Sequence, residues 1–160
     1  MSSSELISLG AREAVAKLHE GEITPLDLID AAEQRIAAVD PAVNALPTLC
    51  LDMARDAAKA LQKPDNPGPG WLAGLPIVVK DVTEVAGVRT THGSPIFADH
   101  ISTHDDLSVE ILKRNGAIVI GKSNTPEFAA GANTFNEVFG KTLNPWNTGM
   151  TCGGSSGGAA

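Results

Sequence analysis

Two lysines and a glycine–serine run are the residues whose types and spacing permit chemistry in this sequence. Lys80 directly follows the β-branched run at 77–79, and Lys122 comes just after a second apolar run at 117–120. Residues 153–158 read Gly-Gly-Ser-Ser-Gly-Gly. Burial at a strand end can lower the pKa of a lysine by several units, and a neutral lysine can remove the proton of a serine hydroxyl. The pattern permits nucleophilic attack on an amide carbonyl, with either lysine as the base.

Ordinary explanations compete with this interpretation. A lysine at the end of a strand commonly buries its stem and keeps its ammonium group in water. A glycine–serine run is commonly a flexible linker, but residues 153–160 follow a tryptophan-containing segment and end in small residues that suit a tightly packed helix. Glycines also allow the main chain to approach a bound group closely. We therefore favour a functional loop.

Two further motifs match the letters of known sites. Residues 116–123 fit the phosphate-binding pattern G-x-x-x-x-G-K-[ST], but an apolar strand occupies the positions where a phosphate cradle needs a loop. Residues 153–157 fit the nucleophile elbow G-x-S-x-G, whose serine follows a strand and precedes its Asp and His partners. Here the turn-rich segment 144–149 comes first, and no such partners follow. A nucleotide-binding module stays a minor alternative, and Ser155 is disfavoured as a nucleophile.

Metal and disulfide chemistry have weaker support in the sequence. Cys50 and Cys152 lack the close pairing of disulfide frameworks or zinc sites, and we expect two reduced thiols. The histidines lack a third ligand at useful spacing, so we interpret all of them as incidental and expect no metal and no cofactor. These histidines are His19, His92, His100 and His104.

The composition limits the class of protein. The chain has 160 residues, 42% hydrophobic and 19% charged, which suits a globular core. Its net charge is −7 and its basic residues are scattered, which argues against a nucleic-acid partner. No apolar run approaches the roughly 18 residues of a membrane span, and the first residues lack the order of a signal peptide. We expect a cytoplasmic protein without membrane contact.

The first 62 residues predict a helical cover. Apolar residues at helical spacing over 11–18 predict a first helix. Residues 24–27 form a capping box with proline at the first helical position, and the helix that they start is expected to end at 40–41. A third apolar face lies over 54–61. These helices are expected to pack against a core that begins later in the chain.

An α/β core is predicted from residue 74 onward. A linker at 63–73, rich in proline and glycine, separates it from the helical cover. The apolar runs at 76–79 and 117–120 predict strands, and residues 107–115 predict a helix between them. Strand, helix and strand in this order imply a parallel pair with a right-handed crossover.

From about residue 5 to residue 160, the sequence resembles the amidase signature family, most densely from Gly74 onward. Three segments carry the likeness: Gly74-Leu75-Pro76-Ile77-Val78-Val79-Lys80-Asp81, then Gly121-Lys122-Ser123-Asn124-Thr125-Pro126-Glu127-Phe128, then Phe139 through Gly158. The resemblance implies an α/β/α fold with a mixed β-sheet, preceded by a helical segment. Residues 1–160 would be the N-terminal part of a single domain whose remainder is absent.

The resemblance also implies roles for single residues. Lys80 would be the base and Ser155 a bridging serine preceded by a cis peptide bond, with the nucleophilic serine roughly two dozen residues farther on. Asp81 is expected to be structural, because an ion pair with Lys80 would raise the pKa of the lysine. The residues implied to line the acyl pocket are Ala129, Ala130 and Gly131. The residues implied to shape the loop are Gly153, Gly154, Ser156, Gly157 and Gly158.

The activity implied by the resemblance is hydrolysis of a small carboxylic acid amide through an acyl-serine intermediate, without a cofactor. We expect residues 1–160 to be inactive alone, because the implied nucleophile lies beyond them. The alternatives are a glutaminase-like subunit of a tRNA-dependent amidotransferase and a non-catalytic remnant. Segment 123–127 looks more like free-standing amidases than like those subunits. The longer protein is compatible with a homo-oligomer.

Overall fold

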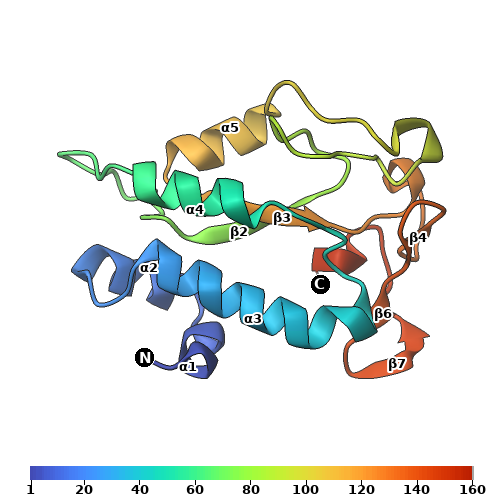
Figure 1. The fold of residues 1–160 in the computed structure, drawn as a ribbon, viewed down its shortest axis with the longest axis horizontal. Coiled ribbons are helices and arrows are strands. Elements are labelled where there is room, and N and C mark those ends of the chain that lie inside the picture. The colour runs from blue at the N-terminus through green and yellow to red at the C-terminus, as the bar shows by residue number, and fades with distance from the viewer. Residues whose placement is uncertain (160) are drawn as a thin grey trace.

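A computed structural model describes residues 1–159 of the chain (Figure 1). The α-helices are α1 (Ser3–Ser8), α2 (Ala11–Glu20), α3 (Pro25–Val43), α4 (Leu51–Ala60) and α5 (Leu107–Arg114). The strands are β1 (Thr48–Leu49), β2 (Pro76–Lys80), β3 (Ile118–Ser123), β4 (Phe135–Asn136), β5 (Gly140–Lys141), β6 (Leu143–Asn144) and β7 (Asn147–Thr151). Short 3-10 helices are η1 (Pro95–Phe97), η2 (Glu127–Ala129) and η3 (Gly157–Ala159).

The predicted capping box starts α3. Asp27 N donates to Thr24 Oγ1 at 3.2 Å, and Thr24 N donates to Asp27 Oδ2 at 2.7 Å. The predicted stop at 40–41 is wrong, because α3 continues through Pro41 to Val43. Pro41 removes a backbone hydrogen bond and crowds the carbonyl four residues earlier, but it lies in the last turn, so only the end of the helix bears this cost. The helix then ends at Asn44, which adopts a left-handed conformation with φ 58°.

A mixed sheet in the order β1-β3-β2 lies at the centre of the fold. Strand β2 pairs with β3 in parallel, as predicted, and β1 pairs with β3 antiparallel. The α/β class with a mixed sheet is therefore confirmed. Strand β1 lies inside the segment predicted as helical, and its two residues are too few to show a periodicity. Strand β3 extends to Ser123, so Lys122 lies within the strand and not after it.

Helices cover both faces of the β2 and β3 pair, as Figure 1 shows. Alternate residues of the strands point to opposite faces, which explains why the predicted strands are apolar throughout. On one face, Val79 and Val119 pack with Val109 of α5. On the other face, Ile118 and Ile120 pack with residues of α3 and α4. Strand β3 is thus fully buried between two helical layers, and β2 is partly buried.

The remaining segments are less regular. Residues 63–70 form neither helix nor strand, as the predicted linker requires. Near the C-terminal end, β4 pairs with β5 and β6 with β7 as small antiparallel ladders, and Trp146 beside β7 is 95% exposed. Among residues 1–159, no helix combines the length and the apolar character that crossing a membrane would require.

Candidate active site

Lys80 is the last residue of β2, and its ammonium group reaches the glycine–serine loop. Its Nζ donates hydrogen bonds to Ser155 Oγ at 2.7 Å and to Ser156 Oγ at 3.1 Å. Burial lowers the pKa of Lys80 below its ordinary value. The fold thus brings together two predicted site residues that are 75 positions apart in the chain. A lysine of lowered pKa in contact with a hydroxyl can exchange a proton with it.

The glycine–serine loop is held by Thr134, which precedes β4. Thr134 N donates to Gly153 O at 2.9 Å, and Thr134 Oγ1 accepts from Gly157 N at 3.0 Å. The peptide bond between Gly154 and Ser155 is cis, as the resemblance implies. These contacts fix both ends of the segment that presents Ser155 to Lys80.

Two of the loop glycines are required by close approach. A Cβ atom at Gly157 would collide with the side chain of Thr134, and one at Gly158 would collide with the backbone N of Asn124. The loop could therefore not lie against β3 with larger residues at these positions. Ala160, the last residue of the predicted loop segment, lies outside the described residues.

A buried polar layer lies beneath the loop and comes from the middle motif of the sequence. Asn124 and Thr125 are fully buried and follow β3 directly. Asn136 Nδ2 donates to Asn124 Oδ1 at 2.8 Å and to Thr125 O at 2.7 Å. Asn124 Nδ2 donates in turn to Thr142 Oγ1 at 2.9 Å. Because its members are hydrogen-bonded to one another, the cost of burying their polar groups is offset, and the layer can support the loop.

Lys122 points away from this site. In the β2 and β3 register, Lys122 pairs with Val79 and Lys80 pairs with Ser123, so the two lysines point to opposite faces of the sheet. Lys122 is fully buried, and its Nζ donates to Thr90 Oγ1 at 2.9 Å. Burial lowers the pKa of Lys122 to about 8. A strand occupies the middle of the 116–123 pattern, which argues against a phosphate cradle there.

Asp81 belongs to the Lys122 side of the sheet. Its carboxylate is fully buried, lies 3.9 Å from Lys122 Nζ and accepts hydrogen bonds from the backbone and hydroxyl of Thr91. Burial raises the pKa of Asp81, against the lowering effects of Thr91 and Lys122. The charge of Asp81 therefore lies beside that of Lys122. Across residues 1–159, Lys80 has no ion pair with Asp81 and contacts the two serines instead.

The predicted acyl-pocket residues lie on the turn that includes η2. Ala129 is half-buried, whereas Ala130 and Gly131 are exposed. Within residues 1–159, no hydrogen bond joins these residues to Lys80 or Ser155. The backbone directly after them, at Ala132 and Asn133, lies close to Gly154. The segment is thus next to the loop, and its role in substrate binding stays a prediction.

Ser123 is a buried residue beside Lys80 that the sequence interpretation missed. It is fully buried, and in the described part of the chain its Oγ has no hydrogen-bond partner. Ser123 pairs with Lys80 in the strand register, so the two side chains point to the same face, but the sequence pattern does not specify this register.

The chain is similar in sequence and in fold to known proteins. The sequence profile of the amidase family matches residues 27–160. The A subunit of the glutamyl-tRNA(Gln) amidotransferase from Carboxydothermus hydrogenoformans is 41% identical over 160 residues, which cover 98% of this chain and 33% of that protein. The chain therefore spans about a third of the length of the curated relatives that it matches.

Solved structures extend the likeness to the fold. The structure of 6-aminohexanoate cyclic dimer hydrolase superimposes with a TM-score of 0.85 at 30% identity, over 94% of this chain and 30% of that one. The A subunit of the glutamyl-tRNA(Gln) amidotransferase from Thermotoga maritima gives a TM-score of 0.66 at 28% identity, over 99% and 30% of the two chains. With a family profile over most of its length and this fold, the chain belongs to the amidase signature family.

Proposed function

We propose that this chain supplies the lysine and the bridging serine of an amide-hydrolysing site. The observation that carries the proposal is the 2.7 Å contact between Lys80 Nζ and Ser155 Oγ. A protonated Lys80 donates this hydrogen bond, and a neutral Lys80 accepts it. Because burial lowers the pKa of Lys80, the neutral form is more populated than for a lysine in water.

The proposed reaction uses Ser155 as a relay. A serine beyond residue 160 loses its proton to Ser155 Oγ, while Ser155 passes its own proton to neutral Lys80. The attacking oxygen bonds to the amide carbonyl carbon, and the proton held on Lys80 returns through Ser155 to the leaving nitrogen as the C–N bond breaks. Water then hydrolyses the acyl-serine by the same proton path. The expected products are a carboxylic acid and ammonia or an amine.

The test uses the protein that the coding sequence specifies when it is read past residue 160. Release of ammonia or amine is measured for aliphatic, aromatic and glutamine amides, with Lys80→Ala and Ser155→Ala each expected to lower kcat by about 10⁴-fold. Ser156→Ala is the matched control, because Ser156 is adjacent and exposed and its longer contact with Lys80 has no relay role. The decrease in kcat for Ser156→Ala should be far smaller than for Lys80→Ala or Ser155→Ala. Activity retained in folded Lys80→Ala or Ser155→Ala protein refutes the assignment.

Residues 1–160 by themselves should release no product in the same assays. The proposal places the attacking serine outside them, so they carry a relay without a nucleophile. Turnover by the purified chain that disappears in Ser155→Ala would instead make Ser155 the nucleophile.

The second candidate is the glutaminase-like subunit of a tRNA-dependent amidotransferase. The 41% identity to such a subunit over nearly the whole chain favours it. The fold match to 6-aminohexanoate cyclic dimer hydrolase, at a TM-score of 0.85 and 30% identity, supports the hydrolase candidate. The two candidates share the Lys80 and Ser155 chemistry and differ in partners.

Purification of the longer protein from its own cells separates these candidates. Co-purification with a second subunit, together with glutamine hydrolysis that depends on it, favours the amidotransferase. Hydrolysis of simple amides by the isolated protein, without a partner, favours the free-standing amidase.

A further inference from the structure

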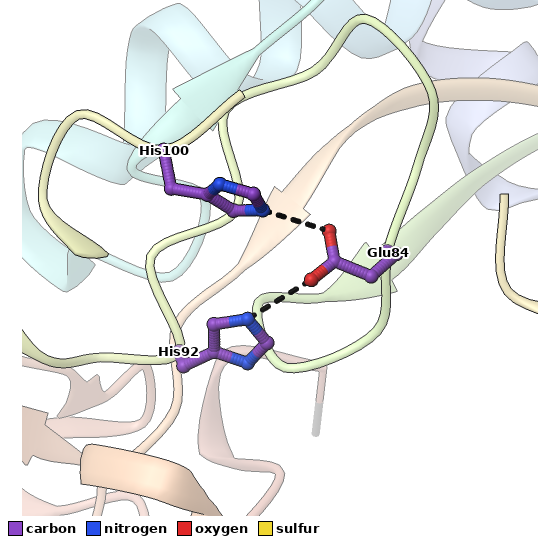
Figure 2. A group of neighbouring side chains, drawn as sticks. All are labelled: Glu84, His92 and His100. Carbon is purple, nitrogen blue, oxygen red and sulfur yellow. Dashed lines mark hydrogen bonds and ion pairs between the residues drawn. The ribbon is translucent and has the colours of Figure 1, made fainter. Parts of the chain in front are cut away.

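Glu84, His92 and His100 come together on the loop that follows β2, as Figure 2 shows. Glu84 Oε1 lies 3.0 Å from His92 Nε2, and Glu84 Oε2 lies 3.4 Å from His100 Nε2. The three ligand-type atoms all lie within 4.8 Å of one another. All three side chains are half-buried, and the cluster includes neither Lys80 nor either serine of the glycine–serine loop.

We propose that Glu84, His92 and His100 form a binding site for a divalent transition-metal ion of the Zn²⁺ type. Two imidazole nitrogens and one carboxylate oxygen are a donor set that Zn²⁺ accepts, with a fourth position left for water. Zinc bonds of about 2.0–2.2 Å in tetrahedral geometry place neighbouring ligand atoms about 3.3 Å apart. Each imidazole nitrogen lies near that spacing from one oxygen of the Glu84 carboxylate, 3.0 Å from Oε1 for His92 and 3.4 Å from Oε2 for His100.

The carboxylate of Glu84 lacks full hydrogen bonding in the part of the chain that the structure describes. Its Oε2 is buried, and the 3.4 Å approach of His100 lacks hydrogen-bond geometry. Burial acts to raise the pKa of Glu84, but Ser102 and the two histidines lower it by more, so the net shift is downward. The ionised form is the one that binds a metal. A cation between the three residues would compensate the partly buried negative charge of Glu84.

The surrounding backbone holds the ligands in place. His92 N donates to Asp81 O at 2.9 Å, and Thr90 N donates to His100 O at 3.0 Å. The ring of Phe97 packs edge-on against both imidazoles, with centroid distances of 5.1 Å to His92 and 6.0 Å to His100. Coordination would therefore require little ordering of the loop, which favours affinity.

The test titrates ZnCl₂ into the purified chain, expressed without a histidine tag, by isothermal calorimetry. One ion per chain is expected to bind. His100→Ala and Glu84→Gln should each weaken binding by at least about tenfold. His104→Ala is the matched control, because His104 is an exposed histidine of the same loop outside the cluster, and it should bind as the wild type does. Unchanged affinity in folded His100→Ala and Glu84→Gln proteins overturns the proposal.

Co²⁺ binding to the unaltered chain gives a second reading that does not depend on variant folding. Ligand-field bands of four- or five-coordinate Co²⁺ without a thiolate charge-transfer band are expected. Only the spectrum of the aqua ion, or a thiolate band that disappears when Cys50 and Cys152 are alkylated, would overturn the site. His92→Asn removes the third ligand and should also weaken binding of the metal. Asparagine is chosen because it tolerates the left-handed conformation of His92 at φ 53°.

Discussion

Lys80 and Lys122 lie at the ends of neighbouring parallel strands, yet their surroundings differ in every respect. Lys80 is half-buried and contacts two serine hydroxyls of a loop from the far end of the chain. Lys122 is fully buried and lies near the carboxylate of Asp81. One residue of strand register separates these outcomes, because it sends the side chains to opposite faces of the sheet. The Lys80 face carries the proposed proton exchange, whereas Lys122 lies in the packed interior near Asp81.

The largest expected effect is on stability, from Lys122→Met. Removing one partner of a buried ion pair leaves Asp81 uncompensated, which costs about 3–5 kcal/mol. Lys80→Met removes only partly exposed hydrogen bonds and should cost about 1 kcal/mol. Urea unfolding followed by circular dichroism measures both values. An equal or larger loss in Lys80→Met would break the contrast between the two lysines.

The pH dependence of stability should also come from the Lys122 face. The folded-state pKa of Lys122 is about 8, below the ordinary 10.5, so between these values the unfolded chain binds more protons. Its contribution to the unfolding free energy therefore rises with pH across this window, by up to about 1.4 kcal/mol per pH unit. Urea unfolding at about pH 8 and about pH 10 measures the difference between wild type and Lys122→Met. If the difference in unfolding free energy between wild type and Lys122→Met is the same at both pH values, the pKa of Lys122 is not lowered by folding.

Gly158→Ala should disturb the Lys80 face by overpacking. The added methyl group would collide with the Asn124 backbone and push the loop away from β3, at a cost of about 1–3 kcal/mol. Gly68→Ala is the matched control, because a Cβ there meets no atom within 4 Å. The unfolding free energy of Gly158→Ala should be lower than that of Gly68→Ala. Equal values would mean that the loop does not rest on β3.

The smallest expected effect is that of Ser123→Ala. This change removes a buried hydroxyl that has no partner in the described chain, so stability should be unchanged or rise by about 1 kcal/mol. Thermal unfolding measures the shift. A loss above about 1 kcal/mol would show that the Ser123 hydroxyl has a hydrogen-bond partner in the folded chain.

The parallel strand pair, its crossover helix and the helix that starts at the Thr24 capping box followed from periodicity and capping residues. Strand β1 did not, because two residues carry no pattern. The extension of α3 past Pro41 also did not follow, since a proline beyond the first turn removes a backbone hydrogen bond and usually ends or kinks a helix. Strand β1 depends on a tertiary contact, its pairing with β3.

The pair Lys80 and Ser155 was found through family motifs, because local sequence does not distinguish Lys80 from Lys122. The distinction depends on strand register, which the sequence pattern did not specify to a single residue. The cluster of Glu84, His92 and His100 was missed for a related reason. Its members are eight residues apart from one to the next, on a loop whose folding brings them together. That spacing matches no helix or hairpin pattern of metal ligands.

The measurement closest to the central claim is an NMR titration of the lysine side chains in the isotope-labelled chain. Lys80 should titrate below its ordinary value of 10.5 and respond to Ser155→Ala, because its Nζ bonds to Ser155 Oγ. Lys122 should not respond to that change. If Lys80 titrates at or above its ordinary value, or is insensitive to Ser155→Ala, it is not the base of a serine relay.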